Sequence, residues 1–86
     1  MAETEITFHN KAAIRVQAQV FAGRTLVSSC VVGPGEIQTL TPADSAPYDI
    51  FFKHSTTGWE IARKLGSQAV EFTLSQVKGK YILLDV

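Results

Sequence analysis

The sequence has few of the residues that mark a metal site, a disulfide scaffold or an active site. It contains one cysteine, Cys30, and two histidines, His9 and His54. A single cysteine forms no internal disulfide, and a structural zinc site needs four ligands. The turn Gly33-Pro34-Gly35 lacks the lysine and the following helix of a phosphate-binding loop. We therefore expect no metal, no cofactor and no enzymatic activity, and we expect Cys30, within an apolar run, to be buried and structural.

An excess of charge of either sign is also missing. Eight basic residues balance eight acidic ones, so the formal net charge is zero. Nucleic acids and anionic membranes attract proteins through excess positive charge. The composition therefore argues against nucleic acid as a partner and counts against a membrane, while it leaves little repulsion between copies of the chain.

Long apolar runs are absent too. No stretch approaches the roughly 20 apolar residues of a membrane-spanning helix. The opening residues, Met1 to Glu5, have neither the basic region nor the apolar region of a signal peptide. We expect a single domain over residues 1–86, located in the cytoplasm, with secretion after processing as the alternative.

What the chain does contain is a regular succession of short apolar runs and turn residues. Glycine, proline and asparagine interrupt the sequence about every 8 to 12 residues, a spacing typical of an all-β sandwich or barrel. The turn signals are Asn10, Gly23, Gly33-Pro34-Gly35, Pro42 to Pro47, Gly58, Gly66 and Gly79. His9-Asn10-Lys11 is interpreted as a turn because asparagine tolerates the left-handed conformation.

Alternation of apolar and polar residues defines the expected strands between these turns. Alternate residues from Ile14 to Val20 share an apolar face, which is typical of a half-buried antiparallel strand. The expected strands cover residues 5–9, 13–21, 25–32, 36–40, 48–54, 59–65, 70–74 and 81–86. Segment 59–65 also fits a short helix between Thr57 and Gly66, but a helix of this length is marginal, so a strand is preferred.

Seven to eight short strands with short connections predict one small antiparallel β-sandwich, immunoglobulin-like or of related Greek-key topology. A small barrel is the alternative architecture. The rhythm of Ile6-Thr7-Phe8-His9-Asn10 and Gly33-Pro34-Gly35-Glu36 resembles that of immunoglobulin-like and other β-sandwich domains. It is also similar to that of small membrane-active sandwich proteins of fungi and bacteria. This resemblance implies an architecture and assigns no functional residue.

Two expected strands, 25–32 and 81–86, have apolar residues on both faces. Such strands are usually central in a sheet or covered at an interface. We therefore expect these two strands either to be central or to be covered by a loop, a helix or a second copy of the chain in a homodimer.

Aromatic and basic residues gather around the turn near Gly58. Alternation puts Phe51 and Phe52 on opposite faces of their strand, so one lies in the core and the other outside. Trp59 begins the next strand beside the turn. The competing interpretation is that all the aromatic side chains here are core residues. The predicted ligand-binding face consists of Tyr48, Phe51, Lys53, His54, Trp59 and Arg63.

These observations lead to three functional hypotheses. The first is a non-enzymatic binding module whose partner is a protein, including a second copy of the chain, or a carbohydrate. The second is association with a membrane surface through exposed aromatic rings beside basic groups. The third is a small hydrolase that uses His54 with Ser55 and Asp49. The spacing of these three residues does not support a triad, and a surface position for His54 explains it equally well.

Overall fold

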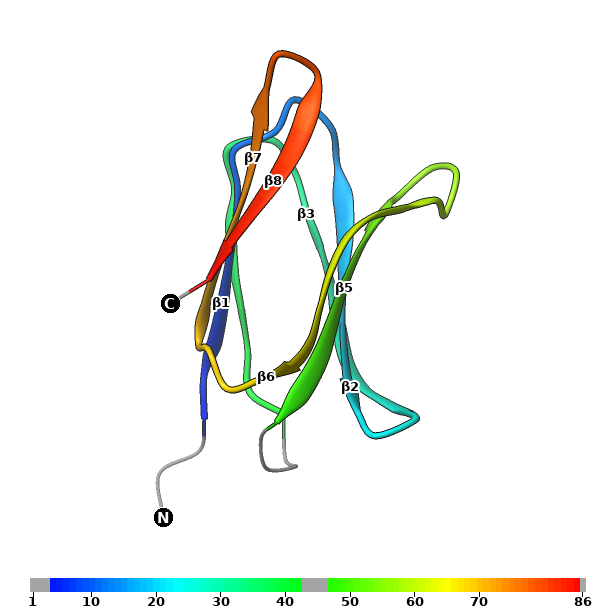
Figure 1. Cartoon of the computed structure of the whole chain (residues 1–86), viewed down its shortest axis with the longest axis vertical. Coiled ribbons are helices and arrows are strands. Elements are labelled where there is room, and N and C mark those ends of the chain that lie inside the picture. The colour runs from blue at the N-terminus through cyan, green and yellow to red at the C-terminus, as the bar shows by residue number, and fades with distance from the viewer. Residues whose placement is uncertain (1–3, 43–46, 86) are drawn as a thin grey trace.

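The computed structural model describes residues 4–42 and 47–85, and these residues form eight strands in two four-stranded sheets (Figure 1). The strands are β1 Ile6–Asn10, β2 Val16–Ala22, β3 Thr25–Val32, β4 Ile37–Leu40, β5 Tyr48–His54, β6 Glu60–Ser67, β7 Glu71–Val77 and β8 Lys80–Asp85. The predicted β-sandwich is therefore confirmed. The alternative barrel is wrong for the described part of the chain, because its strands form two separate sheets and no closed one.

One sheet has the strand order β4-β1-β7-β8 and the other has the order β3-β2-β5-β6. Strands β1 and β7 are parallel, while the other neighbouring strands are antiparallel. In a constant-type immunoglobulin domain the first two strands share a sheet. Here β1 and β2 lie in different sheets, so the connectivity differs from that domain within the same sandwich architecture.

The position of the two strands with apolar residues on both faces differs from the expectation. Both β3 and β8 are edge strands. Leu26 and Val31 of β3, and Ile82 and Leu84 of β8, are exposed large apolar side chains. The alternative in which these strands are central is wrong, because each is the last strand of its sheet, and their second apolar face lies on the outside of the sandwich. Covering of this face by another copy stays a prediction.

Segment 59–65 forms most of strand β6, as preferred, and not a helix. Its backbone pairs with β5, where Phe51 lies opposite Arg63 and Phe52 lies opposite Ala62. The predicted loop from Thr41 to Pro47 includes residues 43–46, which lie outside the described residues. No helix in the described ranges is long and apolar enough to cross a membrane.

The core lies between the two sheets and consists mainly of alternate, inward-facing residues along the strands. Phe8 is at its centre, with ring centroids 5.5 Å from Phe52 and 5.7 Å from Phe72. As predicted, alternate residues of β2 from Val16 to Val20 are fully buried. Cys30 is half-buried opposite Ala18, and partial burial raises the pKa of its thiol.

Asn10 has a different role from the predicted one. It is not a left-handed turn residue but the buried last residue of β1. Its side-chain nitrogen donates hydrogen bonds to the carbonyls of Ile14, at 2.7 Å, and Val32, at 3.0 Å, and its side-chain oxygen accepts one from the N–H of Ala12. These bonds hold the connection that leads into β2, which begins at Val16 and not at Ala13 as expected.

Candidate functional site

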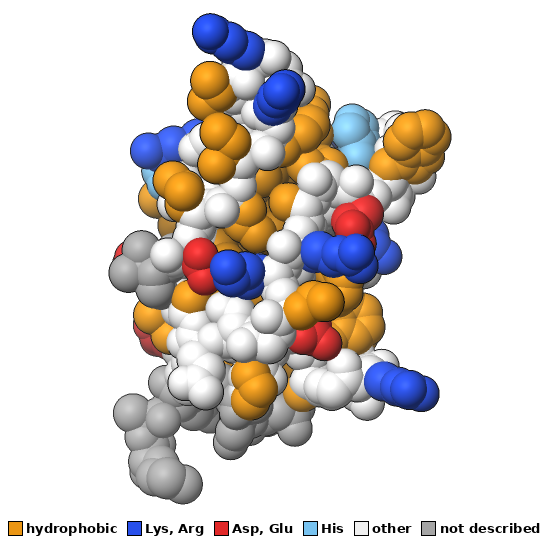
Figure 2. All heavy atoms as spheres, viewed as in Figure 1, with side chains coloured by type: hydrophobic (Ala, Val, Ile, Leu, Met, Phe, Trp, Pro, Cys, Tyr) orange, Lys and Arg blue, Asp and Glu red, His pale blue; other side chains and the backbone are white. Residues whose placement is uncertain are grey.

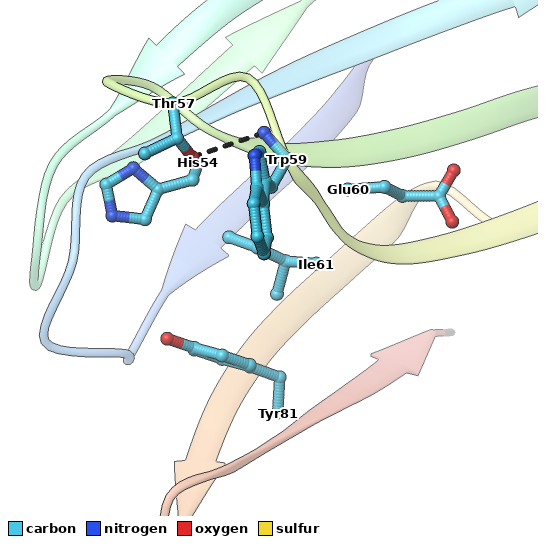
Figure 3. Close-up of a pocket in the computed structure, with 6 residues that line it drawn as sticks. All are labelled: His54, Thr57, Trp59, Glu60, Ile61 and Tyr81. Carbon is cyan, nitrogen blue, oxygen red and sulfur yellow. Dashed lines mark hydrogen bonds between the residues drawn. The ribbon is translucent and has the colours of Figure 1, made fainter.

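The β5–β6 turn and the β7–β8 hairpin stand apart at one end of the sandwich (Figure 1). A groove lies here, lined by residues of both sheets. Its volume is about 390 Å³. In Figure 2 apolar side chains line the hollow between these two hairpins. The lining residues are His54, Thr57, Trp59, Glu60, Ile61 and Tyr81 (Figure 3). The groove therefore combines residues from the edge strands of both sheets.

Trp59 stands at the mouth of the groove, with 78% of the residue exposed to solvent. Its backbone is nevertheless well fixed. The N–H of Trp59 donates to Oγ1 of Thr57 at 3.3 Å, and its carbonyl accepts from the N–H of His54 at 2.8 Å. The N–H of Gly58 donates to the carbonyl of His54 at 2.8 Å, and Gly58 has a φ of 77°, which glycine adopts without strain. The exposed ring is thus presented by an ordered turn.

The opposite side of the groove belongs to the other sheet. Tyr81 of β8 lies across from Trp59 and Ile61, with its ring beside the apolar part of the groove (Figure 3). Both Ile61 and Tyr81 are half-buried and pack against the core. The floor of the groove is therefore continuous with the hydrophobic core, and two aromatic rings flank it.

Three polar side chains of the groove each make one contact within the chain. Oγ1 of Thr57 accepts from Trp59, and Nδ1 of His54 accepts from the N–H of Thr56 at 3.2 Å. Oε2 of Glu60 lies 3.6 Å from Nε of Arg63. Within the described residues the hydroxyl of Tyr81 has no such partner. The groove consequently combines the apolar surface of Trp59, Ile61 and Tyr81 with a small number of polar groups.

The predicted binding face is divided among three places. His54 and Trp59 line the groove, as their position at the turn suggested. Phe51, Lys53 and Arg63 lie together on the outer face of the sheet that contains β5 and β6. The remaining predicted residue, Tyr48, does not lie on a surface.

Tyr48 is 1% exposed and belongs to the core, so its assignment to an exposed face is wrong. The physical reason is the alternation of β5, which puts Tyr48 on the same face as Ile50 and Phe52. Phe51 and Phe52 do lie on opposite faces, with Phe52 in the core, as predicted. The competing interpretation, in which all the aromatic residues are core, fails for Trp59.

Three aromatic or apolar residues were missed. Tyr81 and Ile61 are 20 positions apart. They meet only because β8 and β6, the edge strands of the two sheets, lie along the same edge of the sandwich, so no local sequence pattern predicts their contact. Phe21 packs against Phe51 on an outer face, with ring centroids 5.3 Å apart and an interplanar angle of 84°. The alternation of β2 was sufficient to predict this outward position, because Phe21 follows Gln17 and Gln19 at every second residue and so lies on the same face.

The groups considered for hydrolysis have other partners. Oδ1 of Asp49 accepts a hydrogen bond from the N–H of Gly66 at 2.8 Å, and Nδ1 of His54 accepts from Thr56. A triad needs the carboxylate to orient the imidazole, and Asp49 has no such contact with His54 among the described residues. Within the same part of the chain, no group of three histidine, cysteine, aspartate or glutamate residues is close enough to hold a metal ion.

Comparison of the chain with protein-family models, with curated proteins and with solved structures gives no match.

Proposed function

We propose that this chain is a non-enzymatic binding module that recognises a segment of another protein in the groove between Trp59 and Tyr81. The observation that supports this proposal most is the exposure of Trp59 on an ordered turn. A tryptophan side chain has 150–250 Å² to bury, so covering the exposed part contributes roughly 3–5 kcal/mol to association before the costs of binding are subtracted.

The chemistry of the groove favours a protein partner over a carbohydrate. Sugar hydroxyls need several hydrogen-bonding groups, whereas half of the lining residues, Trp59, Ile61 and Tyr81, present mainly apolar surface. The side chains of Thr57, His54 and Glu60 each have one contact within the chain. Tryptophan and tyrosine are enriched among the residues that dominate the binding energy of protein interfaces. A volume of about 390 Å³ fits one or two apolar side chains of a partner.

Association with a membrane is less well supported. An interfacial protein needs its exposed apolar residues on one side. Here they are spread over edge strands and turns of both sheets. The exposed large apolar residues among those described are Leu26, Val31, Ile37, Trp59, Leu65, Val70, Val77, Ile82 and Leu84.

The test is selection of a random peptide library on the folded protein, followed by titration calorimetry with the enriched peptides. Trp59→Ala should weaken binding at least tenfold, because it removes the central contact of the site. The matched control is Leu65→Ala, which removes a side chain of β6 that is exposed but lies outside the groove. The control should bind as the parent protein does.

Both variants should retain the melting temperature of the parent protein within about 2 °C, since neither residue is in the core. Equal binding by the parent protein and Trp59→Ala contradicts the proposal. So does a response of Trp59 fluorescence to sugars or to lipid vesicles while no peptide binds, and either result names the other partner class.

A further inference from the structure

We infer that the partner segment binds in an extended conformation and adds a strand to the free edge of β8. This inference rests on the proposed function, because the edge of β8 forms one side of the Trp59 groove. β8 is the last strand of its sheet, and no described strand pairs with its outer edge. Addition of a strand to such an edge is a common mode of peptide recognition.

The hairpin that joins β7 to β8 determines which backbone groups are free. Its two-residue turn is Lys78-Gly79, and both residues have positive φ, 52° and 79°. This combination defines a type I′ turn, in which the flanking pair Val77 and Lys80 is hydrogen-bonded. Since hydrogen-bonded and non-bonded positions alternate along an antiparallel pair, the N–H and C=O groups of Tyr81 and Leu83 point away from β7.

The side chains of β8 alternate between the core and the outer face of the sheet. Tyr81 and Leu83 face the core, whereas Ile82 and Leu84 face outward and are 43% and 57% exposed. An added strand continues the same alternation. Every second side chain of the partner therefore enters the groove beside Tyr81 and Trp59 (Figure 3).

An ion pair limits the length of the accessible edge. Nζ of Lys64 on β6 lies 3.8 Å from Oδ1 of Asp85 at the end of β8, which joins the two sheets there. The open part of the edge extends from Lys80 to Leu83, a length of roughly 10 Å at about 3.3 Å per residue. We expect recognition of a short segment, with one or two apolar side chains as anchors.

Charge indicates a further property of the segment. Lys78 and Lys80 lie at the tip of the β7–β8 hairpin, where Figure 2 shows basic side chains at one end of the molecule. The ion pairs found among the described residues involve neither of them. An acidic residue beside the apolar anchor complements these lysines. The inferred ligand is therefore an extended, acidic-apolar peptide segment.

The probe for this inference is the acetylated peptide Asp-Thr-Leu-Thr-Leu-Thr-Asp, added at millimolar concentration to the ¹⁵N-labelled protein. Nuclear magnetic resonance then follows the backbone amides of Tyr81 and Leu83 together with the indole N–H of Trp59. Two further peptides carry N-methyl groups on the leucine amides or on the threonine amides. Only one of these sets can point toward β8 in a given strand direction, so the two peptides serve as matched controls for each other.

We expect the parent peptide to shift all three signals, and one methylated peptide to lose at least tenfold in affinity while the other retains binding. The sensitive set identifies the direction of the strand. Lys80→Gln should weaken binding up to about fivefold, the range of an exposed charge pair. Arg24→Gln, in the β2–β3 hairpin, should not weaken it.

Other outcomes separate the two proposals. A shift of the Trp59 indole without changes at Tyr81 and Leu83, or equal binding of both methylated peptides, overturns strand addition but leaves a binding groove. No shift at any of the three sites overturns both proposals. Light scattering that shows a dimer which the peptide cannot dissociate identifies a second copy as the occupant of the edge, and also overturns the inference.

Discussion

The side-chain nitrogen of Asn10 lies 3.0 Å from the carbonyl oxygen of Val32, and this hydrogen bond joins the end of β1 to the end of β3 in the opposite sheet. Both residues are buried. The carbonyl of Asn10 also accepts from the N–H of Gly35, at 2.8 Å. Through its side chain Asn10 thus holds the β1–β2 loop and the end of β3, and through its backbone carbonyl it holds the turn that follows β3.

Replacing Asn10 with alanine should lower the free energy of unfolding by about 2–4 kcal/mol. The change leaves the carbonyls of Ile14 and Val32 and the N–H of Ala12 without their side-chain partner. The bonds to Val32 and Ala12 are buried, and an unsatisfied buried group costs about 1–3 kcal/mol, whereas the bond to Ile14 is part-buried and water can replace it. Urea unfolding followed by circular dichroism measures the difference. Gln17→Ala, on an outer face of β2, is the control and should change stability by less than about 0.5 kcal/mol. A loss below about 1 kcal/mol for Asn10→Ala contradicts the assigned role.

Phe8→Ala should destabilise the fold by about 3–5 kcal/mol, because it removes a buried ring that packs on Phe52 and Phe72 and leaves a cavity between the sheets. The matched substitution is Phe21→Ala, which removes a half-buried ring that contacts Phe51 on an outer face. Its effect should be clearly smaller, since solvent fills the vacated space. Equal losses in chemical unfolding would mean that the outer pair is as important as the core.

Cys30 should react slowly with iodoacetamide in the folded protein, because partial burial raises the pKa of its thiol and only the thiolate is nucleophilic. The unfolded chain should react faster at the same pH. Since the folded pKa is the higher one, the unfolded state loses its proton first as the pH rises. Stability should therefore be fully present below the unfolded pKa of about 8.5 and should decrease above it.

The control for this pH effect is Cys30→Ala, in which the decrease attributable to the thiol should be absent. Mass spectrometry of the alkylated protein measures the first effect, and unfolding at several alkaline pH values measures the second. Equal alkylation rates for the folded and unfolded chain would contradict the partial burial of the thiol.

Local alternation was sufficient for much of the fold. The bounds predicted for the third and fifth strands are those observed, Thr25–Val32 and Tyr48–His54. The same rule put Phe51 and Phe52 on opposite faces, and the structure has Phe52 in the core. Applied to Tyr48, the rule puts that residue on the face of Phe52 and therefore in the core as well. Alternation succeeds because successive side chains of any extended strand point to opposite sides, whatever the strand pairs with.

The groove was only half predictable. Trp59 and His54 belong to one turn, and their neighbourhood in the sequence indicated a site. Tyr81 could not be assigned to it, because it comes from a strand of the other sheet. Of the two alternatives for β3 and β8, a central position failed for a related reason: an apolar second face does not reveal which strand ends a sheet.

The sequence by itself therefore determined the all-β class, most strand positions and the faces that enter the core, since these depend on period-two patterns within a few residues. Only the tertiary structure decided the strand order, the edge position of β8, the burial of Asn10 and the meeting of Trp59 with Tyr81. These features depend on hydrogen bonds and packing between segments far apart in the chain, and the free edge and groove on which the proposed function rests arise from them.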